Sequence, residues 1–151
     1  ENWLITILGN KIQLVPYTSR HVLKYHEWMK SEEILKLTAS EPLSLEEEYE
    51  MQLSWHEDPN KCTFIILLIN DNEPNEINRM IGDINIFFND RFDRTNVEID
   101  VMIADKNQQR KGYGKEAVYL MMNYAINSFN IRRFYAKINE NNAPSRSMFT
   151  L

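Results

Sequence analysis

The residues best suited to chemistry in this chain lie in one short segment, where glycines and basic side chains are interleaved. Two of the four glycines, Gly112 and Gly114, fall within a single tripeptide, and Arg110, Lys111 and Lys115 surround them. Glycine allows positive φ angles and lets the backbone approach a ligand closely. The first amides of a helix have no partner inside the helix and lie at its positive end. A helix that starts at this segment would therefore bind a phosphate or a pyrophosphate.

Two other phosphate-binding loops fit this segment less well. A Walker loop has four residues between its first glycine and a Gly-Lys pair, and Ser or Thr after the pair. Here the first of these positions is Gln109 and the last is Glu116. A dinucleotide-binding loop accepts Ala117 in place of its third glycine, but it needs an acidic residue at the end of the next strand, and none occurs near residues 134–138. A tight turn that caps a helix without any ligand is the remaining alternative.

Two carboxylates precede this segment in a stretch that alternates apolar and polar residues, as a strand does. Glu98 and Asp100 share one face of this strand with Met102. The other face consists of Val97, Ile99, Val101 and Ile103. A carboxylate can remove a proton from a reacting group, so Glu98 and Asp100 are the candidate general bases. Asp83, on the strand expected before this one, is a weaker candidate, and a polar face with ion pairs is the alternative.

Hydrophobic periodicity predicts the elements that would position these residues. The expected strands cover residues 11–15, 63–69, 80–88, 97–103 and 134–138. The expected helices run from Ser19 to about Lys30, from a capping box at Ser44 and Glu47 to about Trp55, from about Gly114 to Ser128, and onward from Pro144. The last two strands, with the glycine segment and its helix between them, form a parallel crossover. We predict one domain over residues 1–151, of the α+β class, with a largely antiparallel sheet and helices on both faces.

The net charge of −5 argues against a general nucleic-acid binder, but the charge is unevenly distributed. Residues 106–146 carry eight basic and two acidic side chains, whereas residues 1–105 carry nine basic and 20 acidic ones. This asymmetry suggests an anionic ligand near the C-terminal part and a cationic one near the N-terminal part. Two solvated surfaces without ligands are the alternative that the charges alone leave open.

The sequence also lacks the signals of several protein classes. No apolar run approaches the roughly 20 residues that span a bilayer, and no secretory signal is evident at the start, so we expect no membrane partner. The only cysteine, Cys62, excludes an internal disulfide framework and fits a reducing compartment, which we take to be the cytoplasm. With one cysteine and three scattered histidines, no metal site is expected.

Three motifs, in order, resemble the GNAT superfamily of acetyltransferases over roughly residues 97–149. The segment Gln109-Arg110-Lys111-Gly112-Tyr113-Gly114 is similar to the acyl-CoA signature Q/R-x-x-G-x-G/A of that superfamily. The strand at residues 97–103 resembles its fourth strand. Asn142-Ala143-Pro144-Ser145, followed by Met148-Phe149, resembles the Asn-x-x-Ser motif that begins its last helix.

The N-terminal half most closely resembles the eukaryotic N-acetyltransferase-nine family, which is reported to acetylate the N-termini of tubulins. The matching runs are residues 14–19, 25–33, 37–43, 61–65 and 101–104. The resemblance implies an enzyme that transfers the acetyl group of acetyl-CoA to an amine. A protein or peptide N-terminus, with tubulin as a candidate, is the partner that it implies.

The same resemblance implies roles for individual residues. In the superfamily, the fourth and fifth strands splay apart and the pantetheine arm of the cofactor lies between them. Backbone groups of residues 101–103 would hold that arm, the amides of residues 110–115 would hold the pyrophosphate, and Asn142 and Ser145 would contact the sulfur-bearing end. Ser145 is also a candidate proton donor to the departing thiolate. The implied cofactor-binding set is Val101, Met102, Ile103, Gln109, Arg110, Lys111, Gly112, Tyr113, Gly114, Lys115 and Asn142.

This chain departs from the superfamily in two ways. A full member has further strands after the last helix, and this chain lacks them, so we expect a C-terminally truncated domain. The apolar surface that those strands would cover could pair between copies, which makes a homo-oligomer an open expectation. Many relatives also have a tyrosine in the last helix that can protonate the thiolate, and Phe149, at or near that position, cannot do so.

Two other functions stay open at this point. A module without catalysis would keep the glycine segment, bind acyl-CoA and act through partners. A small-molecule acetyltransferase would use the same residues on an aminoglycoside or a polyamine. A nucleotide hydrolase is disfavoured, because the Walker glycine and its Ser or Thr are missing.

Overall fold

A computed structural model describes residues 5–136 of this chain. One sheet of six strands crosses this part, in the order β1-β2-β3-β4-β5-β6. The strands are β1 (Ile7–Leu8), β2 (Ile12–Pro16), β3 (Lys61–Leu68), β4 (Met80–Phe87), β5 (Asn96–Ile103) and β6 (Arg133–Tyr135). Neighbours are antiparallel up to β5, whereas β5 and β6 run parallel. The predicted α+β class with a largely antiparallel sheet is confirmed.

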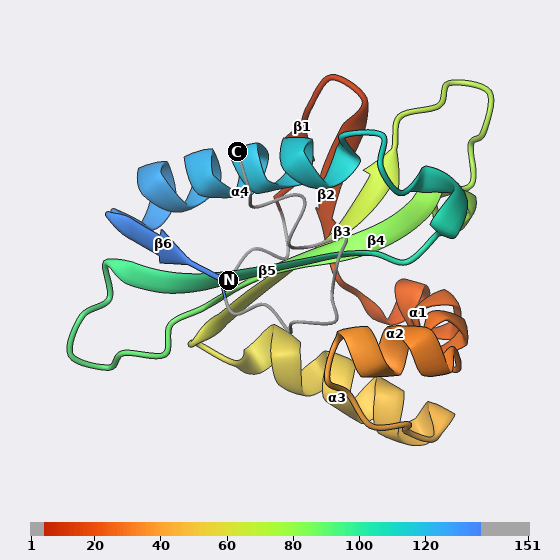
Figure 1. The fold of residues 1–151 in the computed structure, drawn as a ribbon, viewed down its shortest axis with the longest axis horizontal. Coiled ribbons are helices and arrows are strands. Elements are labelled where there is room, and N and C mark those ends of the chain that lie inside the picture. The colour runs from red at the N-terminus through yellow and green to blue at the C-terminus, as the bar shows by residue number, and fades with distance from the viewer. Residues whose placement is uncertain (1–4, 137–151) are drawn as a thin grey trace.

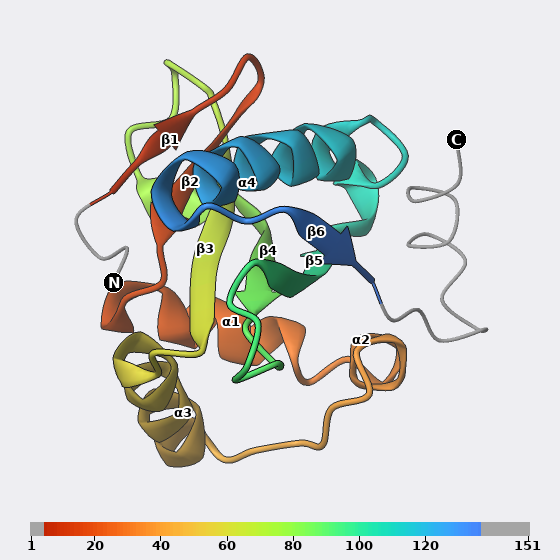
Figure 2. The ribbon, with the colours of Figure 1, turned by 90° about the vertical axis from the view of Figure 1, so that its left-hand side faces the viewer.

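The sheet separates two apolar cores, because successive side chains of a strand point to opposite faces. On one face, α4 (Tyr113–Phe129) packs through Ala117, Met121 and Ala125 onto the isoleucines and valines of the strands. On the other face, α1 (Val22–Trp28), α2 (Glu32–Leu37) and α3 (Leu45–Glu57) cover a second core. Figures 1 and 2 show these three layers, with α4 as the one helix among residues 5–136 on its side of the sheet.

The helix boundaries agree only in part with the sequence analysis. The capping box that starts α3 is confirmed: the Ser44 hydroxyl accepts from the Glu47 amide over 3.1 Å, and the Ser44 amide donates to the Glu47 carboxylate over 2.9 Å. The prediction that Ser19 caps the first helix is wrong, because the extended residue before η1 (Ser19–His21) is Thr18. Neither β1 nor α2 was predicted, since both are too short to show a hydrophobic period. The helix expected from Pro144 lies outside the described residues.

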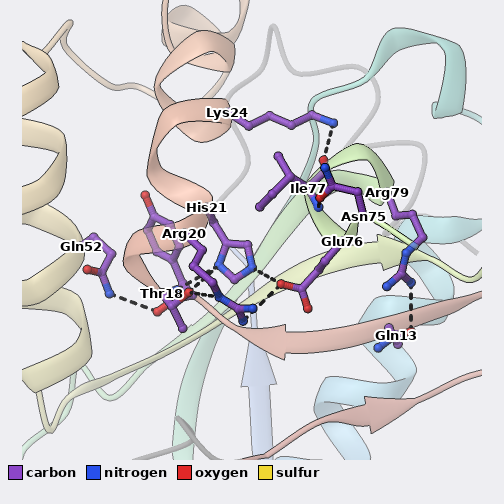
Figure 3. A network of polar contacts seen from close by, with 11 residues as sticks. Gln13, Thr18, Arg20, His21, Lys24, Gln52, Asn75, Glu76, Ile77 and Arg79 are labelled. Atoms are coloured by element: carbon purple, nitrogen blue, oxygen red, sulfur yellow. Dashed lines mark hydrogen bonds and ion pairs between the residues drawn. The ribbon is translucent and has the colours of Figure 1, made fainter. Parts of the chain in front are cut away.

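A network of polar contacts fastens the loop between β3 and β4 to the start of α1 (Figure 3). Nδ1 of the buried His21 accepts from the Thr18 amide over 3.0 Å, and Nε2 contacts the Glu76 carboxylate at 2.8 Å. Because burial lowers the pKa of His21, the neutral ring with its proton on Nε2 fits both contacts. Glu76 opens the short turn η2 (Glu76–Arg79), and Lys24 of α1 donates to the Ile77 carbonyl over 2.7 Å. These bonds fix the position of α1 relative to the start of β4.

Candidate functional site

The glycine segment forms a tight turn between β5 and α4. After β5, the chain makes a short 3-10 turn, η3 (Lys106–Gln108), which Asp105 caps. Arg110 and Gly112 then both have positive φ angles, of 62° and 85°, and α4 begins at Tyr113. Glycine adopts this conformation without strain, whereas at Arg110 it costs free energy. Glycine was expected to be needed in this turn for a positive φ angle, and the structure shows that angle at Gly112.

The backbone amides of residues 110–115 make no hydrogen bond with the rest of the described chain. Those of Tyr113, Gly114 and Lys115 belong to the first turn of α4, where no helical partner exists. Gly112 leaves this end open, since no atom lies within 4 Å of the place that a Cβ would take. Three exposed cations, at residues 110, 111 and 115, surround these donors. Unpaired amides, the positive end of a helix dipole and nearby cations together make an anion site.

Two side chains hold this anion site against the sheet. Gln109 donates from Nε2 to the Ile103 carbonyl over 2.9 Å, and its own amide donates to a carbonyl of η3. Glu116, in the first turn of α4, accepts from the amides of Asn10 and Lys11 over 2.7 and 3.2 Å. The start of α4 is thus tied to the end of β5 and to the turn between β1 and β2. Gln109 shapes the turn, because its donors are used within the chain.

The predicted carboxylates lie on the opposite face of the sheet, the face that α1 and α3 cover. Antiparallel pairing places Asp100 of β5 opposite Asn85 of β4, and Glu98 opposite Phe87. Asp83 lies two residues along β4 from Asn85 and therefore points to the same side. The apolar residues of β5 pack in the core beneath α4. The structure thus brings Asp83, Glu98 and Asp100 to one face. The alternation of β5 had predicted a shared face for Glu98 and Asp100.

Asp83 is deeply buried, with 3% of its surface exposed. The hydroxyl of Tyr25, in α1, donates to its Oδ2 over 3.1 Å. Burial, together with the charge of Asp100, raises the pKa of Asp83 to about 7, although Lys61 and Tyr25 oppose the rise. A carboxyl group with a pKa near neutrality is suited to taking up and releasing protons. This burial makes Asp83 a stronger candidate than its strand position alone suggested.

Lys61 of β3 brings a positive charge to this face. Its Nζ lies 3.3 Å from the ring centroid of Trp55, in α3, and 4.6 Å from that of Phe87. Aromatic faces at these distances favour a cation. Burial nevertheless lowers the pKa of Lys61 to about 8, and the charges of Asp83 and Asp100 limit the shift. The charge of this face therefore changes with pH near neutrality.

Asp100 and Glu98 differ in what surrounds them. The Asp100 side chain is exposed, yet desolvation and the charge of Glu98 raise its pKa, which Lys61 partly offsets. Glu98 instead accepts from Nδ2 of Asn89 over 2.7 Å, and the same amide donates to the Tyr135 hydroxyl over 3.1 Å. Of these two carboxylates, Asp100 has the more exposed side chain.

Strand β5 joins the two parts of the candidate site. Its C-terminal end leads into the anion site, and its polar face carries Glu98 and Asp100. Within the described residues, β6 ends at Tyr135, opposite Glu98, whereas β5 continues to Ile103. This early end of the pairing is consistent with the expected splay of the two strands. A ligand anchored at the anion site could therefore extend along β5 toward the carboxylates.

Several residues could not be foreseen or cannot be placed. Asn142 and Ser145 lie outside the described residues, as does Phe149. Lys61 and Tyr135 gave no signal, because their contacts with Phe87 and Asn89 join segments that are apart in the sequence. Cys62 is a buried residue of β3, and burial raises the pKa of its thiol to about 12, so it is no nucleophile.

Among residues 5–136, no group of three or more His, Cys, Asp or Glu side chains is arranged to hold a metal ion. No helix in that range is long and apolar enough to cross a membrane.

Comparison with known proteins gives close matches over nearly the whole chain. A family model described as "Acetyltransferase (GNAT) domain" matches residues 11–150. An "N-acetyltransferase 9-like protein" of Nematostella vectensis is 51% identical over 148 residues, which cover 96% of this chain and 75% of that protein. An "Alpha/beta-tubulin-N-acetyltransferase 9" of Mus musculus is 51% identical over 150 residues, which cover 95% of this chain but only 61% of the mouse protein.

Solved structures resemble this fold at lower identity. A spermidine N-acetyltransferase from Vibrio cholerae, in complex with CoA and spermine, superposes with a TM-score of 0.77 and 15% identity. The match covers 93% of this chain and 79% of that one. At such identity the likeness shows the fold alone.

The burial of Asp83 predicts a pH dependence of stability that Asp83→Asn should remove. Between about pH 4 and pH 7, the carboxyl is ionised in the unfolded chain but largely protonated in the folded one. The free energy of unfolding of the wild type should therefore fall as the pH rises through this window, by up to about 1.4 kcal/mol per pH unit relative to the variant. Urea unfolding of both proteins across this range measures the difference. A difference that stays constant with pH would mean that Asp83 is ionised in the folded protein.

Proposed function

Since this chain belongs to the acetyltransferase (GNAT) family, within its N-acetyltransferase-nine branch, and is thus an acetyl-CoA-dependent acetyltransferase, we propose that it acetylates the α-amine of a protein N-terminus. One observation carries this proposal: the anion site at the start of α4 and the carboxylate face are joined by the same strand, β5. Acetyl-CoA is a substrate of this reaction. Its diphosphate suits the anion site, and its thioester supplies the acetyl group.

The unpaired amides of residues 110–115 support the binding of the CoA pyrophosphate at the start of α4. Arg110, Lys111 and Lys115 provide the positive charge that a diphosphate needs. Backbone groups of Val101, Met102 and Ile103 would hold the pantetheine arm, because β5 continues past the last residue that pairs with the described part of β6. Gln109 ties the turn to the end of β5, Tyr113 packs against the core beneath α4, and Asn142 is assigned to the cofactor by family likeness alone.

The reaction requires a neutral amine, and the carboxylate face can supply the base. A free α-amine has a pKa of about 8, so most of it is protonated at pH 7. Asp100 is accessible and partly desolvated, and we assign it the removal of this proton, directly or through a water. The neutral nitrogen then attacks the thioester carbon. A backbone amide near the end of β5 stabilises the negative oxygen that forms, and the C–S bond breaks as the amide product is released.

The acidic side chains of the carboxylate face support an amine acceptor, and the names of relatives suggest which amine it is. Asp83, Glu98 and Asp100 face the same side of the sheet with Lys61 as a cation among them, so an ammonium group is attracted there. The mouse relative is named an alpha/beta-tubulin N-acetyltransferase. We therefore propose tubulin N-termini as acceptors, which places the reaction in the cytoplasm.

Changing Gly112 should test the anion site directly. Gly112→Val forces a β-branched residue into a positive φ, so we expect the turn to rearrange and the Kd for acetyl-CoA to rise about tenfold or more. Asn130→Val is the matched control, because Asn130 is left-handed at the other end of α4 with a φ of 56°. Calorimetric titration measures both affinities. Equal binding by the two variants would contradict the assignment of residues 110–115.

Changing the carboxylates should identify the base. We expect Asp100→Asn to lower kcat about 100-fold or more and to remove the acidic limb of the pH–rate profile. Glu98→Gln should cost less, because Glu98 is already held by Asn89. Initial rates from pH 5 to 9 compare the two, with the wild type alongside. An unaltered profile in Asp100→Asn would show that the base is another group.

The choice of acceptor can be decided with matched peptides. Peptides with α- or β-tubulin N-terminal sequences should be acetylated at the α-amine, whereas copies with a blocked N-terminus should not. Mass spectrometry of the products and the release of CoA report the transfer. Turnover with spermine alone would support a small-molecule enzyme, and acetyl-CoA binding without any transfer would support a module without catalysis.

A further inference from the structure

The loop between β4 and β5, residues 88–95, carries the most exposed large apolar side chain among residues 5–136. This side chain is Phe92, with 87% of its surface exposed. Two aspartates shape the backbone around it. Oδ1 of Asp90 accepts from the Phe92 amide over 2.9 Å, and Oδ1 of Asp93 accepts from the Thr95 amide over 2.9 Å. Side-chain turns of this kind favour one conformation of a short loop, so the phenyl ring is held out toward solvent.

Further bonds tie the loop to its neighbours on two sides. Arg94 donates to Oδ1 of Asn60 over 2.6 Å and to the Pro59 carbonyl over 3.1 Å, both in the turn before β3. The Thr95 carbonyl accepts from the Arg132 amide over 2.7 Å, just before β6. A loop that is fixed in this way loses little conformational entropy when it binds a partner.

The surface around the phenyl ring is basic, although the whole chain has a net charge of −5. The guanidinium of Arg91 lies 4.9 Å from the centroid of the Phe92 ring. Hydrogen bonds from Thr95, and then the charges of Arg133 and Arg132, lower the pKa of Asp93, which places these two arginines beside the loop. The exposed arginines of this surface are Arg91, Arg94, Arg132 and Arg133. An aromatic ring among arginines is typical of the anchors of protein interfaces.

The loop adjoins the candidate site. Asn89, near its start, donates to Glu98 of the carboxylate face over 2.7 Å. Figures 1 and 2 show the loop bending toward the side of the sheet that α1 and α3 cover. At its other end, Thr95 is five positions from Asp100 along the chain, which corresponds to about 16 Å of extended strand. A tetrapeptide spans at most about 14 Å, so one with its α-amine at Asp100 does not extend as far as Thr95.

We propose that residues 88–95 form a docking loop for the folded part of the acceptor protein, with Phe92 as its anchor. This inference rests on the proposed function, because it needs a protein as the acceptor. The matching surface of the acceptor has an apolar pocket for the ring and carboxylates around that pocket, which pair with the exposed arginines. The docked protein then presents its N-terminus to Asp100 at a high effective concentration.

Two acceptors separate docking from chemistry: the folded αβ-tubulin dimer, and a tetrapeptide with the β-tubulin N-terminal sequence. We expect Phe92→Ser to raise the KM for the dimer about tenfold or more, because an interface anchor is lost. The kcat and KM for the tetrapeptide should keep their wild-type values, which also shows that the variant folds. Tyr119→Ser is the matched control, since Tyr119 is a ring exposed at 64% on α4, and both acceptors should react with it as with the wild type.

The charge of the partner surface has a test of its own. Arg91→Glu should raise the KM for the tubulin dimer about tenfold, because it places a carboxylate against carboxylates. Raising the salt concentration from about 50 mM to about 300 mM should increase the wild-type KM for the dimer and have a smaller effect on the tetrapeptide. A KM for the dimer that neither change affects would contradict an acidic partner surface.

Equal changes of KM with both acceptors in Phe92→Ser, or no change with either, would overturn the docking loop while the transferase stands. Sedimentation velocity decides whether the loop joins two copies of this chain instead, since a wild-type dimer that Phe92→Ser dissociates would also overturn the proposal. Inhibition of dimer acetylation by single-stranded RNA in the wild type, but not in Phe92→Ser, would assign the loop to nucleic acid. A wild type that acetylates neither acceptor would instead remove the proposed function.

Discussion

The alternation of side chains along β5 is the constraint on which the rest of the site depends. Successive residues of a strand point to opposite faces, so this one strand belongs to two layers. Its apolar residues pack beneath α4 and fix the helix whose first turn offers unpaired amides. Its polar residues, Glu98 and Asp100, point to the same face as Asp83, which lies buried beneath Tyr25 of α1. A shift of one residue in the β4–β5 register would exchange the two faces and remove both parts of the site.

The anion site depends on local conformation, whereas the carboxylate face depends on burial. At the turn, two positive φ angles lead the chain from β5 into α4, and Gln109 and Glu116 hold it to the sheet. On the other face, Asp83 and Lys61 would have the usual pKa values of an aspartate and a lysine if they were in water. Removal from water raises the pKa of Asp83 and lowers that of Lys61, so that both approach neutrality. Proton transfer near pH 7 therefore depends on the helices that cover this face.

Much of the fold could be predicted from the sequence, because its signals are local. The capping box at Ser44, the apolar run of β3 and the alternation of β5 each identify an element within a few residues. The glycine turn was located for the same reason, since positive φ and helix initiation are properties of neighbouring residues. The errors occurred where local signals are weak: β1 and α2 are too short to show a period, and Thr18 stands where Ser19 was expected.

The sequence by itself determined the order of the elements, the face to which each β5 side chain points and the place of the anion site. Family likeness, rather than spacing, indicated the acetyl donor and its acceptor. Only the tertiary structure showed that Tyr25 covers Asp83, that Lys61 lies against Trp55, and that Asn89 joins Glu98 to Tyr135. These contacts unite residues from separate strands and helices. The desolvation that sets their proton affinities arises only when the layers pack, so no stretch of the sequence contains it.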